Sequence, residues 1–356
     1  MAKVEQSAED DGLNVIARRD VHIHNGLTLS DARGLFMDLL SANFPRLRET
    51  ARQAAEQRCE ELFESFWTKL GMQPDIDPGR FERPDVQASI ADTLTNYAKS
   101  PTGDAGDILG DLLVQRVTLD PEDLKTLVIN EALPIAAKLY RRHFDALSLV
   151  FLIKKTLFKS VTVGELFGNL AKAYIPVGVD LGITASDVAY MQVAGCLNST
   201  EGTASFGAAL MQNYGAMFSW FKPQNDEQHK HFNRLKGMKV CLAESEKLTP
   251  LMVRSEIERE AVRFHAPRQV DISVVAEQIP DLDDRQFFQN FVRANQLNED
   301  EALGRLNAYD QRFATIAKRF QLLESMAPTV AGIAIAHANV VRYLPEFNRD
   351  LSTWFS

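Results

Sequence analysis

The stretch NVIARRDVHIH at residues 14–24 places apolar and polar side chains at alternate positions. Because successive side chains of a strand point to opposite faces, this alternation is typical of a half-buried β-strand. Asn25-Gly26 follows with turn chemistry, since both residues tolerate positive φ. We therefore predict a β ladder over residues 13–28. Its apolar face carries Val15, Ala17, Val21 and Ile23.

A long amphipathic helix is predicted at residues 29–72. Ser30 or Thr28 can cap it, and the charge of Asp31 suits its positive end. Apolar residues then recur at spacings of three and four, which gives one buried face. Pro45 removes a backbone donor, so we expect a kink there. The recurring positions include Leu35, Phe36, Leu39, Leu40, Phe44, Ala51, Ala54, Ala55, Leu62, Phe63, Phe66 and Leu70.

The predicted ladder needs a partner, because an isolated hairpin is marginal in water. Little of the later sequence is typical of strands, so a second copy of the chain is the more economical partner. We therefore predict a homo-oligomer formed through the ladder and the helix. The alternatives are pairing within one chain and an ordinary core helix. The residues assigned to self-association are Val15, Val21, Ile23, Leu35, Phe36, Ala51 and Ala55.

Composition is that of a globular protein, with 356 residues, 45% hydrophobic and 24% charged. The net charge of −9 opposes generic nucleic-acid binding, and no apolar run is long enough for a spanning helix. The polar N-terminus is not a signal peptide. Three distant cysteines form no disulfide framework. We expect a soluble cytoplasmic protein without a strong membrane signal.

The rest of the chain predicts a mainly α-helical fold. A disordered tail (1–12) precedes the ladder, and a Pro/Gly-rich linker (73–85) follows the long helix. Residues 86–158 predict a helical bundle or helical-repeat-like body, in which Asp120 caps a helix that starts at Pro121. Residues 159–356 predict a second, mostly helical region that ends in a C-terminal docking segment. Two later segments are strand-like, 237–242 and 269–275.

Several motifs resemble those of an uncharacterised bacterial family. They are Asn14-Val15, Asp20-Val21-His22-Ile23, Gly26-Leu27-Thr28, DILGDLL (107–113), NEALPIA (130–136), ALSLVF (146–151), GIAIAHAN (332–339) and LSTW (351–354). Members of that family begin with an N-I/D-I strand ladder, a G-L-[ST] turn and a long Ala/Glu/Arg helix. Pro45 departs from this uninterrupted helix. The resemblance implies no activity, but it implies a setting in bacterial conflict and anti-phage defence.

Few polar residues lie at positions typical of a catalytic or ligand-binding site. His337 interrupts an apolar helical segment, and Glu201 lies in the glycine-rich middle of the chain. Both are catalytic candidates, although a satisfied buried histidine is the alternative for His337. A basic cluster near one helix junction can receive a phosphate or nucleotide, or it can be the charged ends of core helices. It comprises Arg141, Arg142, Lys154 and Lys155.

Two histidine pairs are candidate metal ligands. His22 and His24 point to one face of the predicted strand, and His229 and His231 have the same spacing. Two imidazoles at this spacing can share a metal ion, but a solvated face is the alternative. We therefore predict no metal and no cofactor.

The leading interpretation is a self-assembling helical scaffold, sensor or adaptor, whose partners are other copies of itself and a further protein. One alternative is a hydrolytic enzyme that uses Glu201, His229, His231 or His337. The other is a triggered effector that perturbs membranes with the apolar helix at 142–158.

Overall fold

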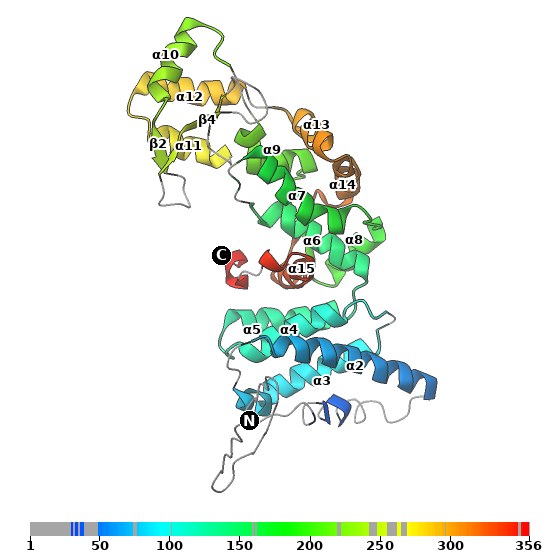
Figure 1. Cartoon of the computed structure of the whole chain (residues 1–356). Coiled ribbons are helices and arrows are strands. Elements are labelled where there is room, and N and C mark those ends of the chain that lie inside the picture. Colours follow the sequence, from blue (N-terminus) through cyan, green and yellow to red (C-terminus); the bar gives the residue numbers. More distant parts are fainter. Residues whose placement is uncertain are drawn as a thin grey trace, which may run out of the picture.

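The structure is a computed structural model of the chain (Figure 1). Most of the described residues are helical, so the prediction of a mainly α-helical protein is confirmed. The predicted ladder at 13–28 and the kink at Pro45 lie outside the described residues. The structure describes residues 30, 33–34, 36–38, 49–73, 77–100, 102–158, 160, 162–218, 222–241, 248–254, 262–264, 269–295, 297–347 and 350–355.

An N-terminal layer consists of α2 (Glu49–Leu70), η1 (Pro78–Glu82), α3 (Pro84–Ala98), α4 (Gly106–Thr118) and α5 (Leu124–Ala136). α2 and α4 approach closely at Gly110, where a Cβ would lie 3.1 Å from the backbone N of Phe66. Phe36 stacks on Phe66 and meets Phe63 edge-on. Phe36 is thereby packed on α2, and Phe66 also meets Phe81 of η1 edge-on, which holds α2 against the layer.

The last long helix, α15 (Val330–Tyr343), lies against the N-terminal layer (Figure 1). It packs on α4 and α5, and also on α6 (Arg141–Lys155). Most of its residues are buried, as expected for a helix that is apolar on all sides. Thr329 caps it, with its Oγ1 accepting from the N–H of Gly332. α15 therefore joins the N-terminal layer to the rest of the molecule.

Beyond α15 the chain folds back as η3 (Pro345–Phe347) and η4 (Leu351–Trp354). We name residues 345–347 and 350–355 the C-terminal strap. Phe347 and Leu351 are buried, and the Trp354 ring meets Phe151 of α6 edge-on. The indole Nε1–H of Trp354 donates to the carbonyl of Lys155 at 3.2 Å. The strap is therefore docked on α6 and α15.

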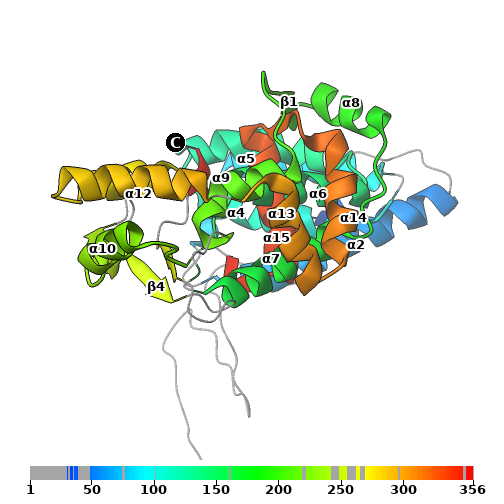
Figure 2. The ribbon, with the colours of Figure 1, turned by 90° about the horizontal axis from the view of Figure 1, so that it is seen from above.

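A further layer covers the other side of α6 (Figure 2). Its short ribbon pairs β1 with β6, antiparallel, with Asn198 opposite Ala327. The hydrophobic core runs without a break from α2 to the strap. The elements of this layer are α7 (Val163–Gly178), α8 (Ala185–Val193), β1 (Leu197–Ser199), α9 (Phe206–Phe218), α13 (Glu299–Tyr309), α14 (Arg312–Phe320), η2 (Gln321–Leu323) and β6 (Met326–Pro328).

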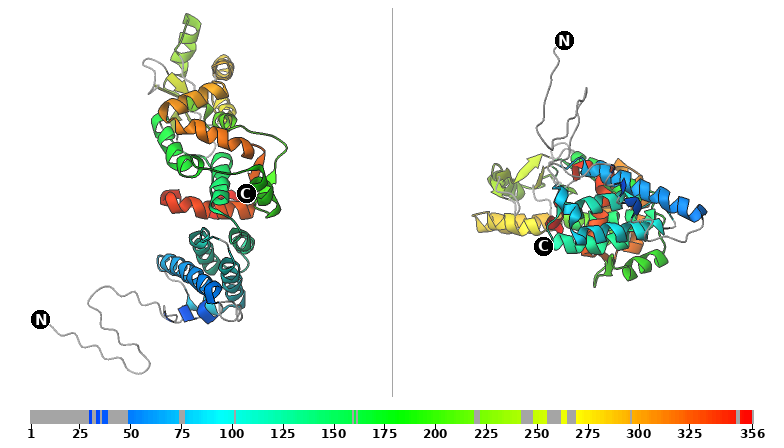
Figure 3. Two further views of the ribbon diagram at one scale, coloured as in Figure 1. Left: turned by 90° about the vertical axis from the view of Figure 1, so that its right-hand side faces the viewer. Right: turned by 90° about the horizontal axis from the view of Figure 1, so that it is seen from below.

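A second, smaller hydrophobic core lies between α9 and α13 in the sequence and projects from one end of the molecule (Figures 1 and 3). Phenylalanine rings dominate it, and Phe288 is fully buried at its centre. Its two short ribbons pair β2 with β3 and β4 with β5. The elements are α10 (Asp226–Leu235), β2 (Lys239–Cys241), β3 (Leu248–Pro250), β4 (Met252–Arg254), β5 (Val262–Phe264), α11 (Gln269–Glu277) and α12 (Leu282–Ala294).

Two local predictions need correction. The segment 269–275 is helix α11 and not a strand, because Ile272, Val275 and Ala276 share one buried helical face. The helix predicted from Pro121 begins at Leu124, where the Asp123 carboxylate accepts the N–H of Lys125. By contrast, β2 lies within the strand predicted at 237–242.

Helices that meet the length and hydropathy needed to cross a membrane are absent from the part of the chain that the structure describes.

Candidate functional site

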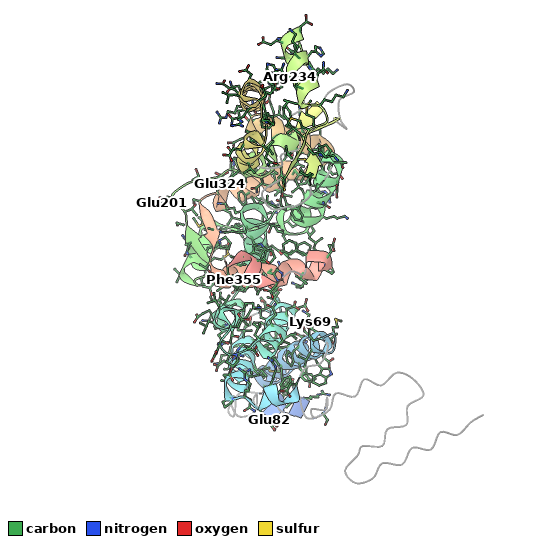
Figure 4. The ribbon with its side chains drawn as sticks, turned by 90° about the vertical axis from the view of Figure 1, so that its left-hand side faces the viewer. Lys69, Glu82, Glu201, Arg234, Glu324 and Phe355 are labelled. Atoms are coloured by element: carbon green, nitrogen blue, oxygen red, sulfur yellow. The ribbon has the colours of Figure 1, made fainter. Side chains whose placement is uncertain are left out.

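A cleft of about 380 Å³ opens between the N-terminal layer and α15, and we name it the interlayer cleft. α2, α4 and α5 line one side, and α15 and the strap line the other. In Figure 4, Lys69 marks the layer and Phe355 marks the strap. The volume falls at the small end of the range for ligand pockets, roughly 300–1,000 Å³. The polar lining residues are Lys69, Gln73, Asp111, Gln115, Thr118, Lys125, His337 and Asp350.

Lys69, at the end of α2, is shared between two carboxylates of α4. Its Nζ lies 2.6 Å from Asp107 Oδ1 and 2.7 Å from Asp111 Oδ2. Asp107 and Asp111 are four residues apart, so both lie on one face of α4. Arg342 of α15 also reaches Asp107, with its Nε 2.6 Å from Oδ2. A chain of ion pairs therefore connects α2, α4 and α15.

The two carboxylates differ in how well they are compensated. Burial raises the pKa of Asp111, because the single ammonium of Lys69 does not offset the lost hydration. Burial also acts on Asp107, but hydrogen bonds from Lys69 and Ser65 and the charges of Lys69 and Arg342 outweigh it. The pKa of Asp107 is therefore lowered. Asp111 has one described ion pair, with Lys69, whereas Asp107 has a second cation in Arg342.

Lys125 of α5 is paired with the strap across the cleft. Its Nζ lies 3.1 Å from Asp350 Oδ2 and 3.3 Å from Asp123 Oδ2. The Asp350 side chain is 59% exposed, so this pair is solvated and contributes little stability. Hydrogen bonds from Ser352 and then from Lys125 lower the pKa of Asp350 to about 2. Lys125 is thus a cation whose partners are readily exchanged.

His337 is the one sequence-predicted catalytic residue that lines the cleft. It is 3% exposed, and its ring centroid lies 5.2 Å from Trp354 and 5.9 Å from Phe347. The surroundings are those of an aromatic core. Glu201 follows β1 on the surface, at the outer edge of the view in Figure 4. The two catalytic candidates therefore belong to different sites.

The predicted basic cluster is divided between the two ends of α6. Arg141 and Arg142 begin the helix and Lys154 and Lys155 end it, so about 20 Å separates the pairs at 1.5 Å per residue. Arg142 Nε donates to Asp187 at 2.9 Å, and Lys154 Nζ donates to the carbonyl of Glu324 at 2.6 Å. These residues do not come together as one phosphate site.

The histidines proposed as metal ligands have other surroundings. His231 stacks on Phe287 at 4.2 Å, and its Nδ1 lies 2.5 Å from Asp284 Oδ1. His229 is exposed on α10. Within the described residues, no three His, Cys, Asp or Glu side chains gather as a metal site. His22 and His24 lie outside the described residues.

The residues assigned to self-association are only partly described. Phe36 and Ala55 are buried in the chain's own core, whereas Ala51 is exposed on α2. The exposed side of α2 also carries charged contacts such as Arg52 with Glu49 and Glu56. Val15, Val21, Ile23 and Leu35 lie outside the described residues.

Sequence reasoning missed Lys69, Asp107, Asp111, Lys125 and Asp350. One local signal was available, because Asp107 and Asp111 place two carboxylates on one face of a largely apolar helix. Arg342, the partner of Asp107, is 235 residues away from it, so local patterns cannot reveal the pairing.

A model of an uncharacterised protein family matches residues 26–355, so the chain belongs to that family. The predicted resemblance to an uncharacterised family is confirmed to this extent. The search of curated proteins and the search of solved structures found no match.

Proposed function

We propose that the chain is a self-assembling helical sensor or adaptor, in which the interlayer cleft receives a small ligand and residues 13–28 join copies. The observation that carries the proposal is the cleft. Its polar walls come from two parts of the chain, represented by Lys125 and Asp350, which are 225 residues apart. A ligand that touches both walls shifts how these parts are held, which is what a sensor requires.

The surroundings of the candidate catalytic groups support binding rather than catalysis. His337 contacts the rings of Phe347 and Trp354, and Glu201, His229 and His231 belong to other parts of the fold. General acid–base catalysis needs such groups within hydrogen-bond reach of one reacting atom. The described ion pairs of the cleft are suited to holding a charged ligand.

Assembly is assigned to the 13–28 segment and not to α2. The described outer face of α2 is charged, and Ala55 faces inward. The alternating pattern at Val15, Val21 and Ile23 supports pairing between copies. The family resemblance supports a cytoplasmic role in bacterial conflict or anti-phage defence.

Size-exclusion chromatography with light scattering tests the assembly. We expect the full chain to exceed the monomer mass of 39.9 kDa at micromolar concentration and a chain starting at Thr28 to be monomeric. Val21→Asp puts a charge on the apolar face of the predicted strand and should give monomers. His22→Asp, on the opposite face, is the matched control and should assemble normally. A monomeric full chain would refute the proposal.

A further inference from the structure

The α4 side of the interlayer cleft presents the carboxylate of Asp111. Asp107 and Asp111 share Lys69, and Arg342 contacts Asp107. Asp111 therefore has one described ion pair, through its Oδ2, whereas Asp107 has two. The Asp111 side chain is 23% exposed and lines the cleft, so a ligand can reach it. Because a carboxylate has two acceptor oxygens, a ligand ammonium can bind Asp111 beside Lys69.

The α5 side of the cleft offers the opposite charge. Lys125 has a side chain that is 20% exposed, yet its partner Asp350 is mostly in water. An exposed ion pair is worth about 0–1 kcal/mol, so a ligand anion can replace Asp350 at little cost. Because the Lys125 side chain is less exposed than that of Asp350, its ammonium is the more fixed of the two groups and can bind an anionic group of a ligand in the cleft.

We infer that the interlayer cleft binds a small zwitterion, with its ammonium at Asp111 and its anionic group at Lys125. The inference rests on the proposed function and names its ligand class. Val114 and Val341 line the same cleft and can contact a short apolar linker between the two charges. Gln115 supplies an amide for further hydrogen bonds. A volume of about 380 Å³ limits the ligand to a small molecule.

Isothermal titration calorimetry of the full chain with matched probes tests this assignment. The zwitterions are 4-aminobutanoate and 6-aminohexanoate, which differ in charge separation. The single-charge controls are butanoate and butylamine. We expect at least one zwitterion to bind at millimolar or lower concentration, and to bind roughly tenfold more tightly than either control, because each lost charged contact is worth about one such factor.

Variants of the two charged positions locate the site. Asp111→Asn and Lys125→Gln should each weaken zwitterion binding by roughly tenfold. The surface variants Asp92→Asn and Lys138→Gln remove the same charges away from the cleft and should leave binding unchanged. Asp350→Asn removes the competitor for Lys125 and should tighten binding several-fold. A misfolded variant would not bind more tightly.

Two results would overturn the inference. One is a zwitterion that binds no better than butanoate or butylamine, or does not bind at all. The other is binding that Asp111→Asn, Lys125→Gln and Asp350→Asn leave unchanged. Light scattering separates failure of this inference from failure of the proposed function. If the chain assembles but does not bind the zwitterions, the ligand class is refuted and the proposed assembly is not.

Discussion

At the scale of single residues, Arg116 is a buried charge that connects three helices. It is 1% exposed, and it lies on α4. Its Nε donates to Asn130 of α5 at 2.6 Å, and its Nη2 donates to Asp85 of α3 at 2.6 Å. Hydrogen bonds from Arg83 and then from Arg116 lower the pKa of Asp85. The ion pair of Arg116 with Asp85 therefore stabilises the layer at neutral pH. Its contribution to the free energy of unfolding is lost as the pH falls below the usual pKa of an aspartate and Asp85 becomes protonated.

Arg116→Ala should lower the free energy of unfolding by about 3 kcal/mol, because it leaves a cavity and removes the hydrogen bonds that Arg116 donates to Asn130 and Asp85. Arg83→Ala is the matched control. Arg83 contacts the same carboxylate at 2.7 Å but from a more exposed position, so its loss should cost less than about 1 kcal/mol. Urea unfolding followed by circular dichroism measures both. Equal losses would contradict the assigned role of burial.

At the scale of helices, close approach of the backbone decides how α15 is seated. A Cβ on Gly332 would lie 2.1 Å from the carbonyl O of Cys196. That carbonyl accepts the N–H of Thr329 at 3.2 Å, and Thr329 Oγ1 donates to the Gly195 carbonyl at 2.7 Å. The start of α15 therefore packs directly against the backbone of residues 195–196, just before β1, and hydrogen bonds join the two segments.

Gly332→Ala should destabilise the protein by about 3 kcal/mol, since the clash is with backbone and not with a flexible side chain. Gly304→Ala provides a control of opposite sign. Gly304 lies inside α13 with no atom within 4 Å of its ideal Cβ, so alanine should stabilise by about 0.5–1 kcal/mol. Differential scanning calorimetry should show one melting temperature falling and the other rising. A neutral Gly332→Ala would show that α15 is loosely seated.

At the scale of the whole molecule, the described residues contain two separate hydrophobic cores. The larger includes the N-terminal layer, α6, α15 and the strap. The smaller is confined to Phe232–Val292 and projects from one end (Figure 3). Cooperativity follows shared packing, so each core should open with its own free energy.

Phe288→Ala should remove about 3–5 kcal/mol from the smaller core and leave the larger core intact. Hydrogen exchange measured by mass spectrometry should then speed up in α10, α11 and α12 but not in α4 or α15. Leu94→Ala, in the fully buried interior of the N-terminal layer, should give the reverse pattern. Faster exchange throughout the chain in both variants would mean that the two cores unfold as one.

Local periodicity explains what was predictable. The apolar spacing in α2, α4 and α15 identified these segments as helical, because a repeat of three and four needs no information from elsewhere in the chain. The same reasoning failed at 269–275, where a few alternating residues fit either a strand or a helix. Of the residues that line the candidate site, only His337 was predicted from the sequence as a functional residue.

The alternation at residues 14–24 and the apolar spacing of the helix predicted after it are visible in the sequence alone, because each depends only on residues that are near neighbours in the chain. The interlayer cleft arises differently. It exists because α15 returns to α4 and α5, bringing Asp350 to Lys125 and Arg342 to Asp107 across more than half of the chain. Charges so far apart in sequence meet only after the core has packed, and only tertiary structure decides such contacts.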